Sequence, residues 1–363
     1  MSTFVRDVYV KTDALTPGRL LRSLKSGLAT GYEGTKIFDR YYALEDLLTV
    51  FLGEIRRRVE HESGEQVDGV VLGRPVHFVG SAGEPDNQLA VERLAHAAQK
   101  AGFADVDFEL EPVAAALHYA LTLRGSQNIL VFDLGGGTLD LTVMRVGEAG
   151  PPTIFATGGL GIAGDVFDQR IIEGMLLDHL GRGSTWGDPP APFPAQYTEA
   201  LINWQTIPEL NRPETLHFLQ LAQLTGSHPK QIQALRSLIV NNYALRMVDE
   251  VERAKIALSD TFFTAIQLAG EDIDIWQPLA RSQFEALIAD ETARVETCLQ
   301  DTLIRSGLSA AEIDAVVRTG GSAQIPRFVH MLERIFGADK TVAADAFSSV
   351  TAGLAVRAYI ERR

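Results

Sequence analysis

The sequence predicts an α/β protein with two lobes, in which helices flank mixed β-sheets. At 363 residues the chain exceeds the length at which a single hydrophobic core usually suffices, so we expect two lobes. Apolar runs of strand length alternate with segments of helical periodicity along the chain. Two of these runs are separated only by a glycine turn, and this hairpin indicates that the sheets are mixed rather than all parallel.

The first half of the chain shows clear strand and helix signals. A mostly helical pattern covers the first 65 residues, where apolar side chains between Tyr41 and Val59 share one face. Pro112 marks a helix start, because its fixed φ suits the first turn. In order, we then expect a strand at 67–73, a helix at 87–101, a strand at 106–110, a helix at 112–123, a hairpin at 128–132 and 138–146, a strand at 153–156 and a helix at 165–180.

The second half begins with a segment that breaks regular structure. Prolines punctuate residues 181–213, which we expect to be rich in loops. Helical periodicity then returns, interrupted by two short apolar runs of strand character. We expect helices at 214–258, strands at 264–268 and 273–275, helices up to 307, a strand at 313–318, and helices at 326–336 and 349–360.

Composition excludes several classes of function. The formal net charge is -14 and basic residues do not cluster with aromatic ones, so nucleic acid is not an expected partner. The single cysteine, Cys298, excludes an intramolecular disulfide and a cysteine metal cluster. The sequence has neither an apolar run long enough to span a bilayer nor the pattern of a signal peptide. We therefore expect a cytoplasmic protein without a membrane partner.

The turn at Gly135, Gly136 and Gly137 is the strongest functional signal in the sequence. Consecutive glycines let backbone N–H groups approach a bound anion closely. Asp133 precedes the turn and Asp140 follows it, and carboxylates beside a phosphate site are typical of water-mediated Mg²⁺ binding. An ordinary hairpin with a glycine-rich turn is the alternative, which the flanking Asp133, Thr138 and Asp140 make less favourable.

Two further helix starts could contribute to a ligand site. Glu111 opens an alanine-rich helix whose small side chains permit close packing against another backbone, and its carboxylate could orient a water or a cation. It could equally be an acid that the helix dipole favours. The junction at Gly320, Gly321 and Ser322 could bring helix N–H groups to a ribose or a phosphate, or could be a structural turn.

Two weaker patterns each have a structural and a ligand-binding interpretation. The run from Gly159 to Gly164 matches G-x-G-x-x-G, but no second strand with an acid follows, so we reject a dinucleotide fold; the glycines could still pack against a phosphate. Glu252 and Lys255 share a helix face. Such a pair is usually a solvated ion pair, although in a cleft it could bind ribose hydroxyls.

The order of these motifs resembles the nucleotide-binding domain of DnaK-type heat-shock chaperones, over roughly residues 15–360. Short matches at 22–26, 72–76 and 348–354 resemble the YegD-type branch of that family, which lacks a standard peptide-binding domain. The motifs are Glu-Pro-x-Ala-Ala-Ala at 111–116, Asp-Leu-Gly-Gly-Gly-Thr-x-Asp at 133–140, Gly-Asp-x-Phe-Asp at 164–168, Glu-Arg-Ala-Lys at 252–255 and Gly-Gly-Ser-x-x-Ile-Pro at 320–326.

The resemblance implies a two-lobed actin-like ATPase fold with ribonuclease H-like sheets, and ATP and Mg²⁺ as ligands. It implies lobe I at 1–124 and 345–363, lobe II at 125–344 with a helical subdomain at about 164–294, and no peptide-binding domain. The resemblance implies that Lys25 contacts the γ-phosphate, that Glu111 positions metal or the attacking water, and that Asp133 and Asp140 lie near Mg²⁺ and bind it through waters. The residues implied to contact the phosphates are Gly135, Gly136, Gly137 and Thr138. Those implied to contact the ribose are Glu252 and Lys255, and those implied to contact the nucleoside are Gly164, Gly320, Gly321, Ser322 and the Gln324 position.

Departures from the family pattern modify these expectations. Ile256 and Gln324 stand where relatives carry two arginines beside the adenine, so stacking of about 0.5–2 kcal/mol per contact is missing and base preference is open. The family's first phosphate loop, an Asp-x-Gly-Thr hairpin, has no counterpart before Lys25. Either a piece upstream of Met1 is missing, which we favour, or the chain is a degraded relative. Both lead us to expect impaired hydrolysis by the 363 residues.

Three functions fit the sequence. The leading one is an ATP-binding, chaperone-like protein that signals to a protein partner or client. The second is a non-catalytic nucleotide sensor or scaffold on the same fold. The third is a small-molecule kinase of the same superfamily, although no residue stands out as the base that a kinase places beside its acceptor hydroxyl.

Overall fold

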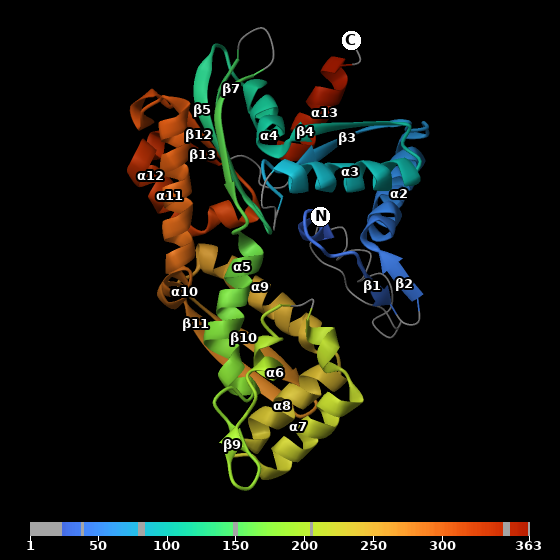
Figure 1. Cartoon of the computed structure of the whole chain (residues 1–363). Coiled ribbons are helices and arrows are strands. Elements are labelled where there is room, and N and C mark those ends of the chain that lie inside the picture. Colours follow the sequence, from blue (N-terminus) through green and yellow to red (C-terminus); the bar gives the residue numbers. More distant parts are fainter. Residues whose placement is uncertain are drawn as a thin grey trace. The chain divides into compact units, whose positions relative to one another are not determined.

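The computed structural model describes residues 24–37, 40–78, 84–147, 152–203, 206–343 and 349–361 (Figure 1). The chain divides into two compact units. Unit 1 comprises Met1–Gly164 and Ala293–Arg363, and unit 2 comprises Asp165–Thr292. The α/β class with a mixed sheet, expected from the sequence, is confirmed. The lobe boundaries near residues 124 and 344 stay a prediction.

A five-stranded mixed sheet forms the core of unit 1 (Figure 1). β5 and β6 are the predicted antiparallel hairpin, and their register places Asp133 opposite Asp140. β12 runs parallel to β5 on its other side, and both strands are fully buried at their centres, as their unbroken apolar runs require. The strand order is β13 (Thr341–Ala343), β12 (Ala315–Thr319), β5 (Gln127–Leu134), β6 (Leu139–Val146) and β7 (Thr153–Leu160).

Two helices of small residues pack together beside this sheet. α4 (Glu111–Ala120) buries Val113, Ala115 and Ala116 against β5, β6 and β12. α13 (Ser349–Glu361) approaches α4 so closely that a Cβ on Gly353 would overlap the carbonyl of Ala114. The alanine-rich helix therefore lies against another backbone, as its composition predicts.

A second layer of unit 1 contains β3 (Gly69–Arg74) and β4 (Asp105–Leu110), which are parallel, with α2 (Leu44–Ser63) and α3 (Glu84–Lys100). Leu28, Leu48 and Ala97 belong to its apolar cluster. β1 (Gly34–Ile37) and β2 (Arg40–Ala43) form an antiparallel pair, so the expectation of a mostly helical start was wrong at these residues. Tyr41 and Tyr42 favour a strand because aromatic side chains suit a pleated surface.

Unit 2 is mainly helical and carries two hairpins. β10 (Phe263–Gly270) pairs with β11 (Ile273–Ala280), and the short β8 (Thr185–Trp186) pairs with β9 (Ala191–Pro192) inside the proline-rich segment. The helices are α5 (Gly164–Ile171), continued by a π-helical turn (Ile172–Leu176) and a 3₁₀ turn (Leu177–Leu180), then α6 (Gln196–Glu199), α7 (Pro213–Thr225), α8 (Pro229–Val240), α9 (Ala244–Asp260) and α10 (Arg281–Leu287).

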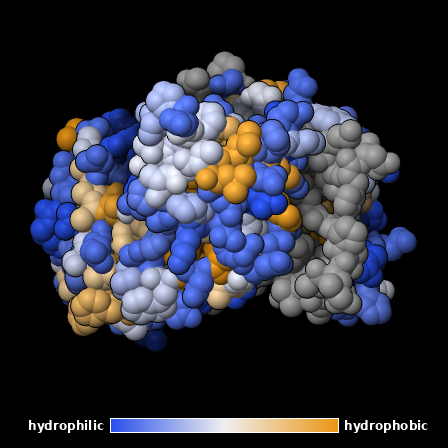
Figure 2. All heavy atoms as spheres, turned by 90° about the horizontal axis from the view of Figure 1, so that it is seen from below, coloured by the Kyte–Doolittle hydropathy of each residue, from blue (hydrophilic) through white to orange (hydrophobic). Residues whose placement is uncertain are grey.

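The remaining helices complete unit 1. α11 (Ala289–Ser306) belongs to unit 1 from Ala293 onward, and α12 (Pro326–Phe336) follows β12. One sequence expectation changes here: Gly159 and Leu160 belong to strand β7, so the glycine-rich turn before α5 is shorter than predicted. None of the helices in the described segments is long and apolar enough to cross a membrane. The face in Figure 2 is mostly hydrophilic, with small separate apolar patches, as the charged composition leads us to expect.

Candidate nucleotide site

The carbonyl of Gly135 is the point at which three predicted motifs meet. It accepts a hydrogen bond from the Gly164 amide at 3.1 Å and another from the Ser322 hydroxyl at 2.7 Å. The amide of Gly135 donates to the Thr138 carbonyl at 3.2 Å, which closes the turn. The structure thus joins the triple-glycine turn, the start of α5 and the turn after β12, although they are far apart in sequence.

The turn leaves its backbone accessible. Gly136 is exposed, whereas Gly135, Gly137 and Thr138 are half-buried. Gly321 is exposed and has no neighbour within 4 Å of where a Cβ would stand. Backbone N–H groups in such a turn can contact an anion without obstruction by side chains.

Asp133 lies at the end of β5, and Gly320 lies directly against it. Gly320 has φ +82°, and a Cβ at that position would overlap the Leu134 carbonyl and approach Asp133 Oδ1 to 2.9 Å. The Asp133 side chain is almost fully buried. A glycine is therefore required at position 320 both for the left-handed backbone and for the space that the carboxylate occupies.

Asp140 ties the turn to a loop that follows β3. Its Oδ2 accepts from the Thr138 hydroxyl at 2.9 Å, and its Oδ1 accepts from the Val76 amide at 2.6 Å. The side chain is 1% exposed. Both oxygens thus already have protein partners, which suits a residue that positions Thr138.

Lys25 and Glu111, which the sequence places 86 positions apart, form an ion pair. Lys25 Nζ contacts Glu111 Oε1 and also lies 3.4 Å from the Gly73 carbonyl. A Cβ on Gly73 would stand 3.1 Å from Glu111 Cγ, so this glycine lets the glutamate approach β3. The structure therefore brings together two residues that the resemblance assigns to catalysis.

The carboxylates of this region repel one another. Burial, followed by the charges of Glu111 and Asp140, raises the pKa of Asp133 well above its usual value, while Lys25 opposes the rise. Burial and the charge of Glu111 raise the pKa of Asp140 to about 7, against hydrogen bonds from Thr138 and Val76. A cation would relieve this repulsion and return the carboxylates to their ionised form.

This donor set fits Mg²⁺ held through water. Within the described ranges, no group of three or more acidic, histidine or cysteine side chains is arranged to ligate a metal directly. Mg²⁺ commonly keeps several waters and takes only one or two carboxylates in nucleotide sites. Asp133 is the residue best suited to that role, because Asp140 already accepts two hydrogen bonds.

Gln324 has a partner that the sequence did not reveal. Arg318, buried in β12, donates from Nη1 to the Ala323 carbonyl at 3.0 Å and to Gln324 Oε1 at 3.1 Å. Burial lowers the pKa of Arg318. The sequence signal for this contact is an arginine inside an otherwise apolar strand. The two hydrogen bonds of Arg318 fix the turn that carries Ser322.

The comparison with known families decides what this arrangement belongs to. A family model described as Hsp70 protein matches residues 27–182 and 233–362. The chain belongs to the Hsp70 family. The predicted resemblance to DnaK-type chaperones is thereby confirmed, whereas the YegD-type branch stays a prediction.

Curated relatives agree with this assignment. The chain is 26% identical over 353 residues to Chaperone protein DnaK of Thermosipho africanus (strain TCF52B), which covers 95% of this chain and 49% of the relative. It is 25% identical over 354 residues to Chaperone protein DnaK of Thermotoga neapolitana, and this match covers 95% of this chain and 50% of the relative. The chain spans about half the length of the curated relatives it matches.

In unit 2, Lys255, which the resemblance assigns to the ribose, pairs with an acid on another helix. Lys255 Nζ lies 2.8 Å from Asp168 Oδ1, and both side chains are about 90% buried, with 10% and 9% exposed. Burial raises the pKa of Asp168 to about 6; Lys255 lowers it, while Glu252 and Asp165 raise it. Asp168 lies in the quoted motif at 164–168, but the sequence analysis gave it no role.

Proposed function

We propose that this Hsp70-family chain binds a nucleotide with Mg²⁺ at the triple-glycine turn and uses it in a chaperone-like function. The observation that carries the proposal is the Gly135 carbonyl, which accepts from Gly164 and Ser322 beside Asp133. This arrangement joins a nest of accessible amides to a buried carboxylate. Amides suit phosphate oxygens, and the carboxylate suits a hydrated Mg²⁺.

The chain's residues would divide the work as follows. The amides of Gly136 and Gly137 would bind phosphate oxygens, and Asp133 would hold the waters of Mg²⁺. The Thr138 hydroxyl donates to Asp140 and so would help to hold the turn in place. When bound, Mg²⁺ would neutralise phosphate charge. Glu111 would orient the attacking water, and its ion pair with Lys25 holds that ammonium ready for a terminal phosphate.

We further propose that a polypeptide of these 363 residues hydrolyses ATP slowly. The motif Asp-x-Gly-Thr does not occur in the sequence of residues 1–24, and phosphoryl transfer depends on clamping the phosphates from more than one side. The Lys25–Glu111 pair also favours a nucleotide sensor as a second candidate, because both groups neutralise each other before any substrate binds.

The relatives are named as chaperone proteins, and on that ground we propose a protein partner or client in the cytoplasm. Base preference is part of the same proposal. Gln324 accepts a hydrogen bond from Arg318 and stands where relatives carry an arginine beside the adenine. Because no arginine at this position stacks on the base, we expect ATP and GTP to differ little in affinity.

Calorimetry tests the proposal. ATP is titrated into the chain with Mg²⁺ or with a chelator, and phosphate release is followed separately. We expect binding that tightens with Mg²⁺, together with slow release of phosphate. The absence of any nucleotide binding would contradict the proposal, and family-like turnover would contradict its hydrolysis part. No phosphate release despite tight binding would favour the sensor.

A further inference from the structure

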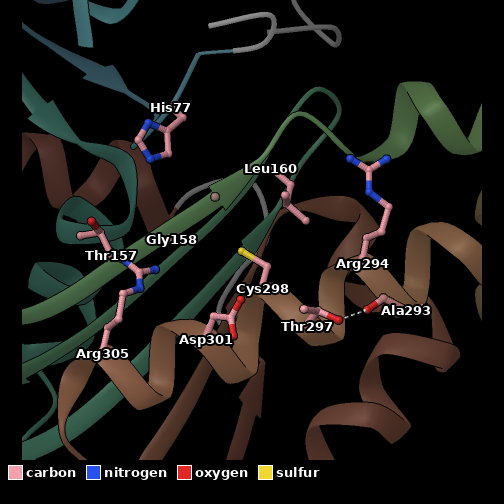
Figure 3. Close-up of a pocket in the computed structure, with 11 residues that line it drawn as sticks. His77, Thr157, Gly158, Leu160, Ala293, Arg294, Thr297, Cys298, Asp301 and Arg305 are labelled. Carbon is pink, nitrogen blue, oxygen red and sulfur yellow. Dashed lines mark hydrogen bonds between the residues drawn. The ribbon is translucent and has the colours of Figure 1, made fainter. Parts of the chain in front are cut away.

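A pocket outside the candidate nucleotide site lies between β7 and α11. Its cavity of about 530 Å³ is lined on one side by Thr157–Leu160 and on the other by α11 residues from Ala293 to Arg305 (Figure 3). All of these residues belong to unit 1. A volume of this size is typical of pockets that hold small organic ligands.

Three charged side chains of α11 reach this pocket from one face of the helix. Arg294 lies at one end, Asp301 and Arg305 lie toward the other, and Cys298 lies between them (Figure 3). Their spacing of seven and then four residues follows the helical repeat. Within the described parts of the chain, the ion pairs found include none of these three side chains. Two cationic groups and one acid therefore line the cavity, and none of them is in an ion pair with another described residue.

Gly158 of β7 creates the room for Arg305 beside the strand. A Cβ on Gly158 would overlap Thr302 Oγ1 and stand 3.2 Å from Arg305 Nη2. A Cβ on Gly159 would stand 3.5 Å from the His77 ring, on the other side of the strand. Arg305 Nη2 meanwhile donates to Thr302 Oγ1 at 3.2 Å, which orients the guanidinium beside β7.

His77 adds a hydrogen-bond donor of defined tautomer. Asn87 Oδ1 accepts from the Phe78 amide at 3.0 Å, so the Asn87 atom that lies 3.2 Å from His77 Nδ1 is the amide nitrogen, a donor. His77 Nδ1 must accept that bond. In the neutral ring the proton is then on Nε2, and this pocket-lining histidine provides one N–H donor.

We propose that this pocket binds a small α-amino acid that carries a second carboxylate at its far end. Arg305 would bind the α-carboxylate and Asp301 the α-ammonium group, while Arg294 would bind the far carboxylate. This assignment uses all three charges of the cavity with opposite partners. A dicarboxylate that lacks the amine would place its own charge beside Asp301, and like charges weaken binding.

The only cysteine of the chain allows binding to be measured at the pocket itself. Cys298 lines the cavity, and burial raises its pKa, so labelling with a thiol reagent is best followed at a mildly alkaline pH at which the amino acids keep their ammonium groups. Glutamate, α-aminoadipate and α-aminosuberate are tested as protectants, beside glutarate, adipate and suberate as their amine-free counterparts. No nucleotide is present, so the result is independent of the proposed nucleotide site.

We expect at least one amino acid of the series to slow labelling of Cys298, and its amine-free counterpart to protect less. Solvent-exposed charge pairs are weak, so each contact is expected to change the half-protecting concentration about two- to fivefold. Equal protection by amino acids and dicarboxylates, or no protection by any of the six compounds, would overturn the proposal.

Variants assign the contacts. Asp301→Asn should remove the preference for the amino acid over its amine-free counterpart, and Arg294→Ala should remove the advantage of the second carboxylate over a monocarboxylate such as norleucine. Arg57→Ala, an exposed arginine paired with Glu54 on α2, is the matched control and should leave protection unchanged. Unchanged selectivity in Asp301→Asn, with circular dichroism showing a folded protein, would contradict the assignment.

Discussion

The glycine-turn site in unit 1 and the Lys255–Asp168 pair in unit 2 are held together by different kinds of interaction. Around Gly135 the contacts come from backbone atoms and one hydroxyl, and three motifs meet because glycines permit close approach. In unit 2 two buried, opposite charges hold α5 to α9. A backbone site depends on where glycines stand, whereas a buried ion pair depends on a partner that only the fold supplies.

This difference determines how substitutions should destabilise each region. Replacement of Gly320 in unit 1 should change the backbone geometry of the turn, because a Cβ at that position would displace the Leu134 carbonyl. Removal of the Lys255 charge in unit 2 should leave the buried Asp168 carboxylate without its ammonium partner, and an uncompensated buried charge is strongly destabilising. The predictions below proceed from the largest expected effect to the smallest.

The largest effect is expected for Lys255→Met, which leaves the buried Asp168 carboxylate without its ammonium partner. We expect a loss of about 3 kcal/mol in the free energy of unfolding. The three tryptophans of the sequence fall within residues 165–292, the range of unit 2, so urea unfolding followed by tryptophan fluorescence reports this unit.

The control for this variant replaces both members of the pair. Lys255→Met together with Asp168→Leu should regain most of the lost stability, because a well-packed apolar pair can substitute for a buried ion pair. If Lys255→Met alone were as stable as the original chain, the ion pair would not be what holds α5 to α9.

A somewhat smaller effect is expected for Gly320→Ala in unit 1. The positive φ and the overlap with the Leu134 carbonyl should destabilise the chain by about 2–3 kcal/mol, measured by calorimetric unfolding. Gly321→Ala is the adjacent control, since nothing stands within 4 Å of its Cβ position. Equal stability of the two variants would show that close approach at Gly320 does not shape the site.

The smallest effect is a pH dependence that arises from Asp168. Its pKa is about 6 in the folded chain, above the usual 3.8, so the folded state binds more protons between these values. Its contribution to stability is therefore complete below pH 3.8 and is lost as the pH rises through 6. Compared with Asp168→Asn, the original chain should lose on the order of 1–2 kcal/mol of relative stability from pH 4 to pH 7. A difference that is constant, or that grows with pH, would contradict this.

Much of the fold was predictable because its signals are local. The hairpin around the triple-glycine turn follows from two apolar runs and the turn itself, and the helix at Pro112 follows from proline at a helix start. The β1–β2 pair was missed because its few residues are too short to show a period against the helical pattern that follows.

The candidate site likewise contains residues that the sequence predicted and residues that it did not. Gly135, Gly164, Gly320 and Ser322 were singled out from turn chemistry, and the structure brings Gly135, Gly164 and Ser322 together by hydrogen bonds. Asp168 and Arg318 were missed although one lies in a quoted motif and the other interrupts an apolar strand, because their importance comes from partners on other elements or from burial. Side-chain partners between distant elements require the fold.

The most direct test of the nucleotide site is the magnesium dependence of ATP binding in Asp133→Asn. Asparagine removes a charge that burial and neighbouring acids disfavour, so the variant should be at least as stable as the original chain by calorimetric unfolding. We predict that Mg²⁺ tightens ATP binding to the original chain by about tenfold or more, and that Asp133→Asn abolishes this gain. A folded Asp133→Asn chain that keeps the full gain from Mg²⁺ would contradict the site described here.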